Sequence, residues 1–238
     1  MIQPKITVIM PAYNAENYIK DAINSILKQT LRPMEILVVN DGSTDKTRKI
    51  IGNWSLKEPL VKLITQEHEG IGSARKRGVG LARGDFITFL SVDDTWESEF
   101  LKKTYDFWKE QTPIDNKKIV YTYWKRCAEQ MYELVDIKCQ EGNNNIIAKA
   151  PDCIVMFDTL FMSKDVFKEV NFDENAKVGE DMIFVLETIK KGYQYILLKE
   201  TLARYRVHDK QMSGKWTQEE YNYHAVKVEK LKREIRGV

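Results

Sequence analysis

Short apolar segments alternate with amphipathic ones over the first hundred residues. Four runs rich in β-branched and aromatic residues, at 6–10, 36–39, 61–65 and 86–90, are typical of buried strands. In residues 19–27 the apolar positions recur at spacings of three and four, which predicts a helix packed on a sheet. This alternation predicts parallel strands joined by right-handed crossovers, with helices on both faces of the sheet.

Turn and capping residues set the limits of these segments. Pro11 is expected to end the first strand, and Asn14 is a favourable N-cap for the helix that follows. Further helices are predicted through residues 47–54, 71–83 and 100–108. Residues 1–110 are therefore expected to form a regular α/β half.

The pattern is less regular beyond residue 110. Antiparallel strands are expected at 120–124 and 131–135, a polar loop at 141–145, helices at 163–170 and 180–191, and strands at 195–198 and 202–207. A charged helix is predicted from residue 218 onward. A chain of 238 residues could form one large α/β domain or two small ones, and we expect one domain over residues 1–238, with a second half at 111–216 and a C-terminal helix at 217–238.

Composition narrows the class of protein. Lys and Arg number 37 against 35 Asp and Glu among 238 residues, so no strong positive charge favours a nucleic-acid partner. Three widely spaced cysteines without a C-x-x-C motif suit a reducing compartment: Cys127, Cys139 and Cys153. No apolar run approaches the roughly 18 residues of a membrane span, and the start of the chain lacks a signal-peptide pattern. We expect a soluble, cytoplasmic protein.

Two of the predicted strands run directly into acidic residues. Asp41 follows the second strand, and Asp93 with Asp94 follows the fourth. In an open α/β sheet, ligands bind outside the carboxyl ends of the strands, so these acids are expected to converge on one pocket. The carboxylate of Asp41 could accept the imide N–H of a uracil or ribose hydroxyls. The alternative is that these residues cap the next helix. Capping accounts for Asp45 or Ser43 at their positions, but it does not account for Asp41.

Asp93 and Asp94 are adjacent carboxylates, which repel each other in a partly desolvated cleft unless a proton or a cation intervenes. A hard divalent ion resolves this conflict. Mg²⁺ or Mn²⁺ held by one or two carboxylates, water and phosphate oxygens is usual at nucleotide sites. The alternative is that the pair caps the helix after Trp96.

Three further features need support from outside the local pattern. Glu180 and Asp181 open a predicted helix, where acids are common because they complement the helix dipole. His208 follows a strand flanked by arginines and by itself is more typical of a surface residue. Residues 70–75 (GIGSAR) have Arg75 in place of the third glycine of a dinucleotide-binding loop, although two glycines before a helix still suit a diphosphate.

Five short motifs occur in order along the chain: residues 11–14 (PAYN), 39–45 (VNDGSTD), 73–75 (SAR), 89–94 (FLSVDD) and 179–181 (GED). With this ordered set, the chain resembles the family 2 inverting glycosyltransferases over nearly its whole length. The resemblance implies a GT-A fold, with a Rossmann-like, mostly parallel central sheet flanked by helices and a smaller antiparallel portion on the acceptor side. It implies that residues 1–110 bind the nucleotide sugar and residues 111–216 the acceptor. Residues 206–208 and 211–213 look like the family's closing segment, with the loop to Trp216 folding over the donor.

The resemblance also implies roles for individual residues. Asp181 would be the general base that takes the proton of an acceptor hydroxyl. Asp93 would ligate Mn²⁺ or Mg²⁺ at the diphosphate, with His208 as a further metal contact. Asp94 and Glu180 would hold the donor sugar or the acceptor. The residues expected around the UDP-sugar are Pro11, Ala12, Tyr13, Glu16, Asp41, Arg75, Ser91 and Asp93. For Glu16, capping of a first helical turn is an equal alternative.

The implied activity is transfer of a sugar, hexosyl in type, from UDP to an acceptor hydroxyl in one inverting displacement, in bacterial-type polysaccharide or glycolipid assembly. The acceptor would be a carbohydrate or a lipid-linked saccharide. Ser91 departs from the family pattern because its Asp-x-Asp motif usually begins with an acid, and Met182 stands where an aromatic residue often follows the acidic pair. Two alternatives stay open: a sugar-nucleotide-binding protein without transferase activity, and a sugar nucleotidylyltransferase. Members of the latter class normally have a glycine-rich, arginine-containing loop after the first strand, and residues 11–14 do not resemble such a loop.

The C-terminal segment combines apolar and basic residues. Its apolar positions are expected to share one face: Tyr221, Ala225, Val228, Leu231 and Ile235. Its cations are Lys227, Lys230, Lys232, Arg233 and Arg236. Such a helix usually packs on its own domain. The alternative is peripheral contact of the basic side with an anionic membrane that presents a lipid-linked acceptor.

Overall fold

The computed structural model describes residues 3–111, 117–131, 133–139, 142–143, 146, 155–173, 175–209, 211 and 216–237. Within these residues, nine strands form one sheet in the order β3-β2-β1-β4-β8-β6-β9-β5, and β7 pairs with β6. The strands are β1 (Ile6–Ala12), β2 (Glu35–Asp41), β3 (Val61–Gln66), β4 (Phe86–Phe89), β5 (Thr95–Trp96), β6 (Lys118–Cys127), β7 (Glu133–Ile137), β8 (Phe161–Ser163) and β9 (Gln194–Arg206).

The first half has the predicted alternation of strands and helices. Strands β3, β2, β1 and β4 are parallel neighbours, so their carboxyl ends lie at one edge of the sheet. The helices of the chain are α1 (Ile19–Leu27), α2 (Thr47–Lys57), α3 (Ile71–Leu81), α4 (Phe100–Glu110), α6 (Glu180–Lys190) and α7 (Gln218–Arg236). The predicted helix positions in residues 1–110 and the helix that begins at Glu180 are confirmed.

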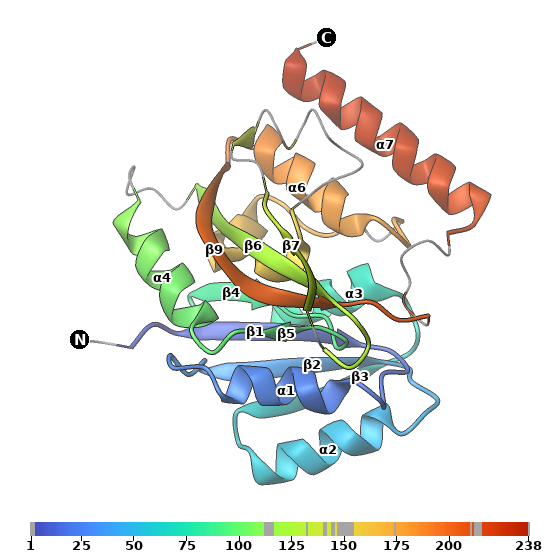
Figure 1. Cartoon of the computed structure of the whole chain (residues 1–238). Helices are drawn as coiled ribbons and strands as arrows, with labels where there is room; N and C mark the ends of the chain where they lie inside the picture. Colours follow the sequence, from blue (N-terminus) through green and yellow to red (C-terminus); the bar gives the residue numbers. More distant parts are fainter. Residues whose placement is uncertain are drawn as a thin grey trace.

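Helices cover both faces of the sheet. Because successive side chains of a strand point to opposite faces, the residues of β1 contribute to two hydrophobic cores. Val8 and Met10 pack with residues of α1 and α2, whereas Ile9 packs with Val79 of α3 and with residues of α6. Figure 1 shows this division, with α1 and α2 on one side of the strands and α6 and α7 on the other. Helix α3 lies so close to β1 that a Cβ at Gly78 would meet Ile9 Cγ2 at 2.5 Å, so a larger residue does not fit there.

Two predicted limits in the first half are wrong. Strand β1 continues through Pro11, which pairs in register with Val39; proline lacks a backbone donor but is tolerated here near the strand end. Asn14 does not cap α1, whose N-cap is Tyr18. Instead, Asn14 adopts a positive φ of 46°, and its Oδ1 accepts a hydrogen bond from Thr44 N at 2.9 Å. The asparagine thus stabilises the turn after β2.

The second half differs more from the prediction. The expected strands at 195–198 and 202–207 are one 13-residue strand, β9, which pairs parallel to β6 and antiparallel to β5. The expected helix at 163–170 is the end of β8 followed by a short 3₁₀ helix (Lys164–Lys168). The antiparallel pairing of β6 and β7 is confirmed. Cys153, Met212, Ser213 and parts of the predicted loop at 141–145 lie outside the described residues.

Helix α7 packs against α6 at the top of Figure 1. Its buried residues are His224, Val228 and Leu231, whereas Tyr221, which was expected on the apolar face, is 53% exposed. Several of its cations pair with acids, for example Lys227 with Asp173 at 3.2 Å. Among the described helices, none is long and apolar enough to cross a membrane.

Candidate active site at the carboxyl ends of the strands

Asp41 is the last residue of β2, and its buried carboxylate binds the loop that leads into α3. Gln66 Nε2 and Glu69 N donate to Oδ1 at 2.8 and 2.9 Å. Gly70 N donates to Oδ2 at 3.0 Å, and His68 Nδ1 lies 2.9 Å from the same oxygen. Because an ionised carboxylate is acceptor-only, Nδ1 must be the donor in that contact. Asp41 therefore does not cap α2; Asp45, which precedes the N-cap Lys46, instead accepts from Thr47 N at 2.9 Å.

A flat aromatic surface lies beside Asp41. The rings of Tyr13 and His68 stack with their centroids 4.0 Å apart and their planes at 18°. Tyr13 is 43% exposed, and the His68 side chain is 54% exposed. The sequence reasoning missed His68; its signal is an imidazole in the polar linker between a strand end and a glycine-started helix. The imidazole contacts Asp41 and Tyr13 together.

Pro11, Ala12 and Glu16 surround this surface in different ways. Pro11 and Ala12 end β1 next to Val39 and Asn40 of β2, and both are buried. Glu16 was expected near the nucleotide, but its Oε2 accepts from Lys46 N at 3.0 Å. Lys46 is the N-cap of α2, so Glu16 stabilises the start of the neighbouring helix rather than its own.

Asp93 and His208 meet although they lie far apart in the sequence. Asp93 Oδ2 is 3.2 Å from His208 Nε2, and the two side chains are 24% and 4% exposed. The His208 ring packs on Tyr18 with a centroid distance of 4.4 Å. Among the described residues, no group of three or more His, Cys, Asp or Glu side chains could hold a metal ion. A carboxylate and an imidazole at this distance could nevertheless share one ion whose other ligands come from a bound diphosphate and water.

Arg206, at the end of β9, fixes the turn that carries both aspartates. Its backbone N–H donates to Asp94 Oδ1 and its Nε to the Asp93 carbonyl, both at 2.8 Å. The guanidinium also pairs with Asp21 at 2.9 Å and donates to the Glu129 carbonyl. The alternative that Asp93 and Asp94 cap α4 is excluded, because the N-cap of α4 is Glu99 and Trp96 lies in β5.

Asp94 was expected to contact the donor sugar or acceptor, but it is buried with Asp158. Asp94 is 2% exposed and Asp158 is 3% exposed. Burial, together with the charges of Asp93 and Asp158, raises the pKa of Asp94 well above its usual range. Ser91 Oγ donates to Asp158 Oδ1 at 3.1 Å. The sequence reasoning missed Asp158, whose signal is a single charged residue inside the largely apolar run at 155–162.

Arg75 and Glu180 form a buried ion pair. Their side chains are 4% and 5% exposed, and Arg75 Nη1 donates to Glu180 Oε1. The guanidinium also lies 4.4 Å above the ring of Phe157. Burial raises the pKa of Glu180 to about 7, and the positive charge of Arg75 opposes this shift. In this structure the two side chains pair with each other below the surface, and the expected contacts of Arg75 with the diphosphate and of Glu180 with the donor sugar or acceptor stay predictions.

Asp181 is the more open member of the Glu180–Asp181 pair. It lies in the first turn of α6, is partly exposed, and accepts from Met182 N at 2.7 Å. Gly179 precedes the helix with a φ of 66°, and a Cβ there would meet His224 Nε2 of α7 at 2.4 Å. Glycine is therefore required both by the left-handed backbone and by the close approach of α7. Helix α7 thus packs directly behind the start of α6.

Helix α3 connects these groups. Its Ser73 Oγ lies 3.4 Å from Gln66 Nε2, which donates to Asp41, while its Arg75 pairs with Glu180. A Cβ at Gly72 would be only 3.4 Å from Glu180 Cγ. The first turns of α3 therefore bridge the end of β2 and the start of α6.

Unpartnered polar atoms gather in the same region. Among the described residues, four buried side-chain atoms have no hydrogen-bond partner: Asn40 Oδ1, Gln66 Oε1, Arg75 Nε and His224 Nε2. Three of them belong to residues at the ends of β2 and β3 and in α3, and the fourth lies behind Gly179. Buried polar atoms are almost always paired, so each of these four atoms could accept a partner from outside the described residues.

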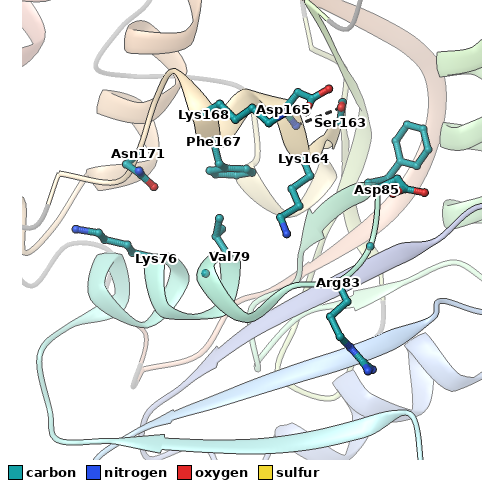
Figure 2. A pocket seen from close by; sticks show the side chains of 13 residues that line it. Lys76, Val79, Arg83, Asp85, Ser163, Lys164, Asp165, Phe167, Lys168 and Asn171 are labelled. Carbon is teal, nitrogen blue, oxygen red and sulfur yellow. Dashed lines mark hydrogen bonds and ion pairs between the residues drawn. The ribbon is translucent and has the colours of Figure 1, made fainter.

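A hollow of about 700 Å³ lies elsewhere, between the second half of α3, the start of β4 and the 3₁₀ helix after β8. Figure 2 shows Lys76, Lys164 and Phe167 among the side chains around it. It lies at the amino end of β4, because Phe86 pairs with Ile6 at the start of β1. Lys164 Nζ donates to the Ala82 carbonyl there. The hollow therefore lies at the opposite end of the parallel strands from the acids.

Comparisons with known proteins identify the family. The sequence profile described as Glycosyl transferase family 2 matches residues 7–169. The chain is 28% identical to glycosyltransferase GlyA of Streptococcus pneumoniae over 92% of its own length and 33% of that protein. It is 32% identical to the minor teichoic acid biosynthesis protein GgaB of Bacillus subtilis over 85% of its own length and 23% of that protein. The chain thus spans a third or less of these two relatives.

A solved structure shows the same fold. S. aureus TarS in complex with UDP-GlcNAc superposes with a TM-score of 0.75, over 94% of this chain and 66% of the TarS chain, at 24% identity. The resemblance inferred from the five motifs is confirmed by the profile match, and the predicted fold class by this superposition. The chain belongs to glycosyltransferase family 2 and has the GT-A fold.

Proposed function

We propose that this chain transfers a sugar from a UDP-sugar to an acceptor hydroxyl with inversion at the anomeric carbon, in the assembly of a bacterial cell-wall polysaccharide. The observation that carries the proposal is the bridge through α3 between the strand-end carboxylate Asp41 and the Glu180–Asp181 pair. Two comparisons support it: GgaB is described as a teichoic acid biosynthesis protein, and TarS crystallised with UDP and with UDP-GlcNAc.

The uracil would bind at Asp41 and Tyr13. Three of the four donors to the Asp41 carboxylate come from Gln66 and the backbone of the loop before α3, and the fourth is the exposed imidazole of His68. The uracil imide has the same properties as this imidazole, since it is flat and donates one N–H. We infer that the base replaces His68 at Asp41 Oδ2 and stacks on Tyr13.

Asp93 and His208 would hold Mn²⁺ or Mg²⁺ at the diphosphate. Their ligand atoms are 3.2 Å apart, and Arg206 fixes the turn that carries Asp93. When bound there, the ion supplies electrostatic stabilisation of the charge that develops on UDP as it leaves. The residues of this chain contribute the orientation: Arg206 and the Tyr18 ring hold the carboxylate and the imidazole side by side.

Asp181 would be the general base. Of the two acids at the start of α6, Glu180 is committed to Arg75 and buried, so only Asp181 is open to an acceptor. Its carboxylate would take the proton of the acceptor hydroxyl while that oxygen attacks the anomeric carbon, and a single displacement inverts the configuration. A positioned base is worth about 10²- to 10⁴-fold in rate. Glu180 and Arg75 would then position the α6 start rather than touch the sugar.

A panel of UDP-sugars tests the proposal. We expect one donor, with Mn²⁺, to raise the free energy of unfolding by about 2.7 kcal/mol at a hundred times its Kd. Slow release of UDP from that donor distinguishes a transferase from a protein that only binds nucleotide sugars. Asp93→Ala should lose the metal-dependent part of the stabilisation, while Asp106→Asn, a surface variant on α4, should keep it. No stabilisation by any UDP-sugar would contradict the proposal.

Peripheral membrane contact through α7 stays a prediction. Several cations of this helix have acidic partners: Lys227 pairs with Asp173, Lys230 with Glu234 and Arg233 with Glu229. Exposed pairs of this kind contribute little energy and are screened by salt, so an anionic surface could still compete for the lysines and arginines. Co-sedimentation with anionic vesicles tests the contact, and its absence at low salt would contradict it.

A further inference from the structure

The hollow of about 700 Å³ beside α3 has the size of a pocket for a small molecule. Such pockets usually measure about 300 to 1,000 Å³ and combine apolar walls with a few polar groups. One wall is the second half of α3, and the other is the 3₁₀ helix Lys164–Lys168. None of the residues around it has a role in the proposed transfer of a sugar.

Gly80 leaves the α3 wall of this hollow bare. The other two glycines of α3 adjoin the protein itself: a Cβ at Gly72 would be 3.4 Å from Glu180 Cγ. At Gly78 a Cβ would be 2.5 Å from Ile9 Cγ2. A Cβ at Gly80, in contrast, would have no heavy atom within 4 Å. Glycine inside a helix is destabilising relative to alanine, so a bare wall here suits a ligand that approaches the helix backbone closely.

Apolar side chains line the hollow from both walls. Val79 comes from α3, and Phe167 comes from the 3₁₀ helix. Phe167 stacks on Phe184 of the core with the ring centroids 5.4 Å apart, yet it stays partly exposed at the hollow. Figure 2 shows the Phe167 ring and the Val79 side chain on opposite sides of the open space. An apolar part of a ligand would therefore contact both walls.

Cations outnumber acids around the hollow, four to two, so it favours an anion. The charged residues are Lys76, Arg83, Lys164 and Lys168 with Asp85 and Asp165. Two of the cations have acidic partners, since Arg83 pairs with Glu35 at 2.8 Å and Lys168 with Asp165 at 2.6 Å. The other two cations therefore supply the excess positive charge.

These two cations are Lys164 and Lys76. Lys164 Nζ donates to the carbonyl of Ala82, the C-cap of α3, where a cation opposes the partial negative charge of the helix end. An ammonium has three hydrogens, so this bond leaves two for a ligand. Lys76 lies further from that helix end, and Figure 2 shows it with Asn171 at one end of the open space. An anionic group there would meet an ammonium and an amide N–H donor.

We propose that this hollow binds a phosphate monoester of an apolar alcohol. The phosphate contacts Lys76 and Asn171, with Lys164 as a second ammonium, and the apolar part lies between Phe167 and the bare stretch of α3 at Gly80. A phosphate monoester carries a charge of about −1.5 to −2 at pH 7 and offers three acceptor oxygens. It therefore matches two ammonium groups better than a carboxylate does. The ester could be a lipid headgroup or a free soluble molecule, and the inference does not rest on the proposed function.

Calorimetry with four probes, in buffer without divalent metal, tests the chemistry of the ligand. The probes are octyl phosphate, inorganic phosphate, octanol and octyltrimethylammonium. Each buried methylene is worth roughly a factor of four in Kd, so octyl phosphate should bind at least tenfold more tightly than inorganic phosphate. Its charge should also make it bind at least tenfold more tightly than octanol or the cationic probe. If octyl phosphate binds no more tightly than any one of the other three, the proposal is overturned.

A pair of glycine variants tests the place of binding. Gly80→Ala and Gly52→Ala each add a methyl group to a helix where the chain has room for it. Both should raise the melting temperature by about 2 to 4 °C. Only Gly80→Ala should weaken binding of octyl phosphate, by about threefold, and Gly80→Leu should weaken it at least tenfold. Because leucine favours a helix, lost binding in Gly80→Leu with an undiminished melting temperature reports a filled hollow.

A lysine variant tests the phosphate contact. Lys76→Ala should weaken binding of octyl phosphate at least threefold and leave that of octanol unchanged. Lys49→Ala, which removes an exposed lysine from α2, is the matched control and should change neither. If Gly80→Leu and Lys76→Ala both keep the full affinity, octyl phosphate binds elsewhere and the proposal is overturned. An unmodified chain that binds UDP but not octyl phosphate overturns this inference and leaves the proposed function intact.

Vesicles distinguish the two sources of the ester. Phosphatidylcholine vesicles with and without phosphatidic acid, whose headgroup is a phosphate monoester, are sedimented with the unmodified chain and with Gly80→Leu. Sedimentation that requires phosphatidic acid and is lost in Gly80→Leu supports a lipid headgroup as the ligand. Binding of octyl phosphate without such sedimentation supports a free soluble ester. Sedimentation that Gly80→Leu keeps in full, together with unchanged octyl phosphate binding, overturns the site.

Discussion

Asp41 and Asp93 both lie at the carboxyl edge of the sheet, yet different parts of the chain hold them. The four donors to the Asp41 carboxylate lie 25 to 29 residues away in sequence, in the loop between β3 and α3. The contacts of Asp93 and Asp94 with Arg206 and His208 span 112 to 115 residues. One cluster is thus completed within the first half, whereas the other exists only when both halves are packed together.

This difference indicates which substitutions should have the larger effect on function. A cluster that one half completes by itself should tolerate changes in the other half. A cluster whose members come from β4, β9 and the 3₁₀ helix at Phe157–Thr159 depends on the packing of the second half. Substitutions in the long-range part should therefore have the larger consequences, and those around Asp41 the smaller.

The largest expected effect is on the proposed base. Asp181→Asn keeps the size of the side chain and its acceptor for Met182 N, but it removes the group that takes the acceptor proton. We expect turnover to fall by about 10²- to 10⁴-fold and the Kd for UDP to change less than about threefold. A coupled assay of UDP release gives turnover, and calorimetry gives the Kd. Unchanged turnover would remove Asp181 from the base role.

The buried pair of Arg75 and Glu180 should dominate stability. Glu180→Ala leaves the Arg75 guanidinium buried without its acidic partner, which typically costs about 3 to 5 kcal/mol. Glu180→Gln keeps an acceptor for Arg75 and should cost less. Denaturant unfolding measures both, with Glu187→Gln on the same helix as the matched control. A loss below about 1 kcal/mol in Glu180→Ala would show that the two halves do not depend on this pair.

The site residues that the sequence predicts also differ between local contacts and contacts across the two halves. Asp41 ends a strand, Asp93 follows one within four residues and Asp181 lies at a helix start, so the local pattern already indicates their places. Asp158 and Arg206 lie inside apolar or alternating segments, and only the register of β6, β8 and β9 brings them to the turn after β4. No local periodicity specifies a contact across 67 or 113 residues.

The same distinction explains why the pairing of Arg75 with Glu180 could not be predicted. Each occurs in a motif at a helix start, so the sequence indicates that both lie near the site. Which of them faces the ligand depends on how closely α3 and α6 approach, and that is set by small residues such as Gly72. The helices come near enough for the two charges to pair, and pairing withdraws both from the surface.

The ionisation of Glu180 should make stability depend on pH. Its pKa is raised from 4.5 to about 7 in the folded chain, so the folded state holds more protons than the unfolded state between these values. The free energy of unfolding should therefore decrease as pH rises through this window, by up to about 3 kcal/mol. Urea unfolding at pH 5 and pH 8 measures the change. Glu180→Gln should show a smaller difference, and an equal slope in both proteins would exclude Glu180 as its source.

The smallest effect, and the test of whether the Asp41 cluster is self-contained, concerns His68. Its imidazole occupies Asp41 Oδ2 and the face of Tyr13, so a base that binds there must first displace it. His68→Ala removes one hydrogen bond and one ring contact from the free protein, each worth about 1 kcal/mol. UDP should then bind up to about thirtyfold more tightly by calorimetry, while Glu67→Ala in the same loop should change nothing. Weaker binding in His68→Ala would instead mean that the imidazole contacts the nucleotide. The cluster around Asp41 would then need its ligand to be complete, just as the cluster around Asp93 needs the second half of the chain.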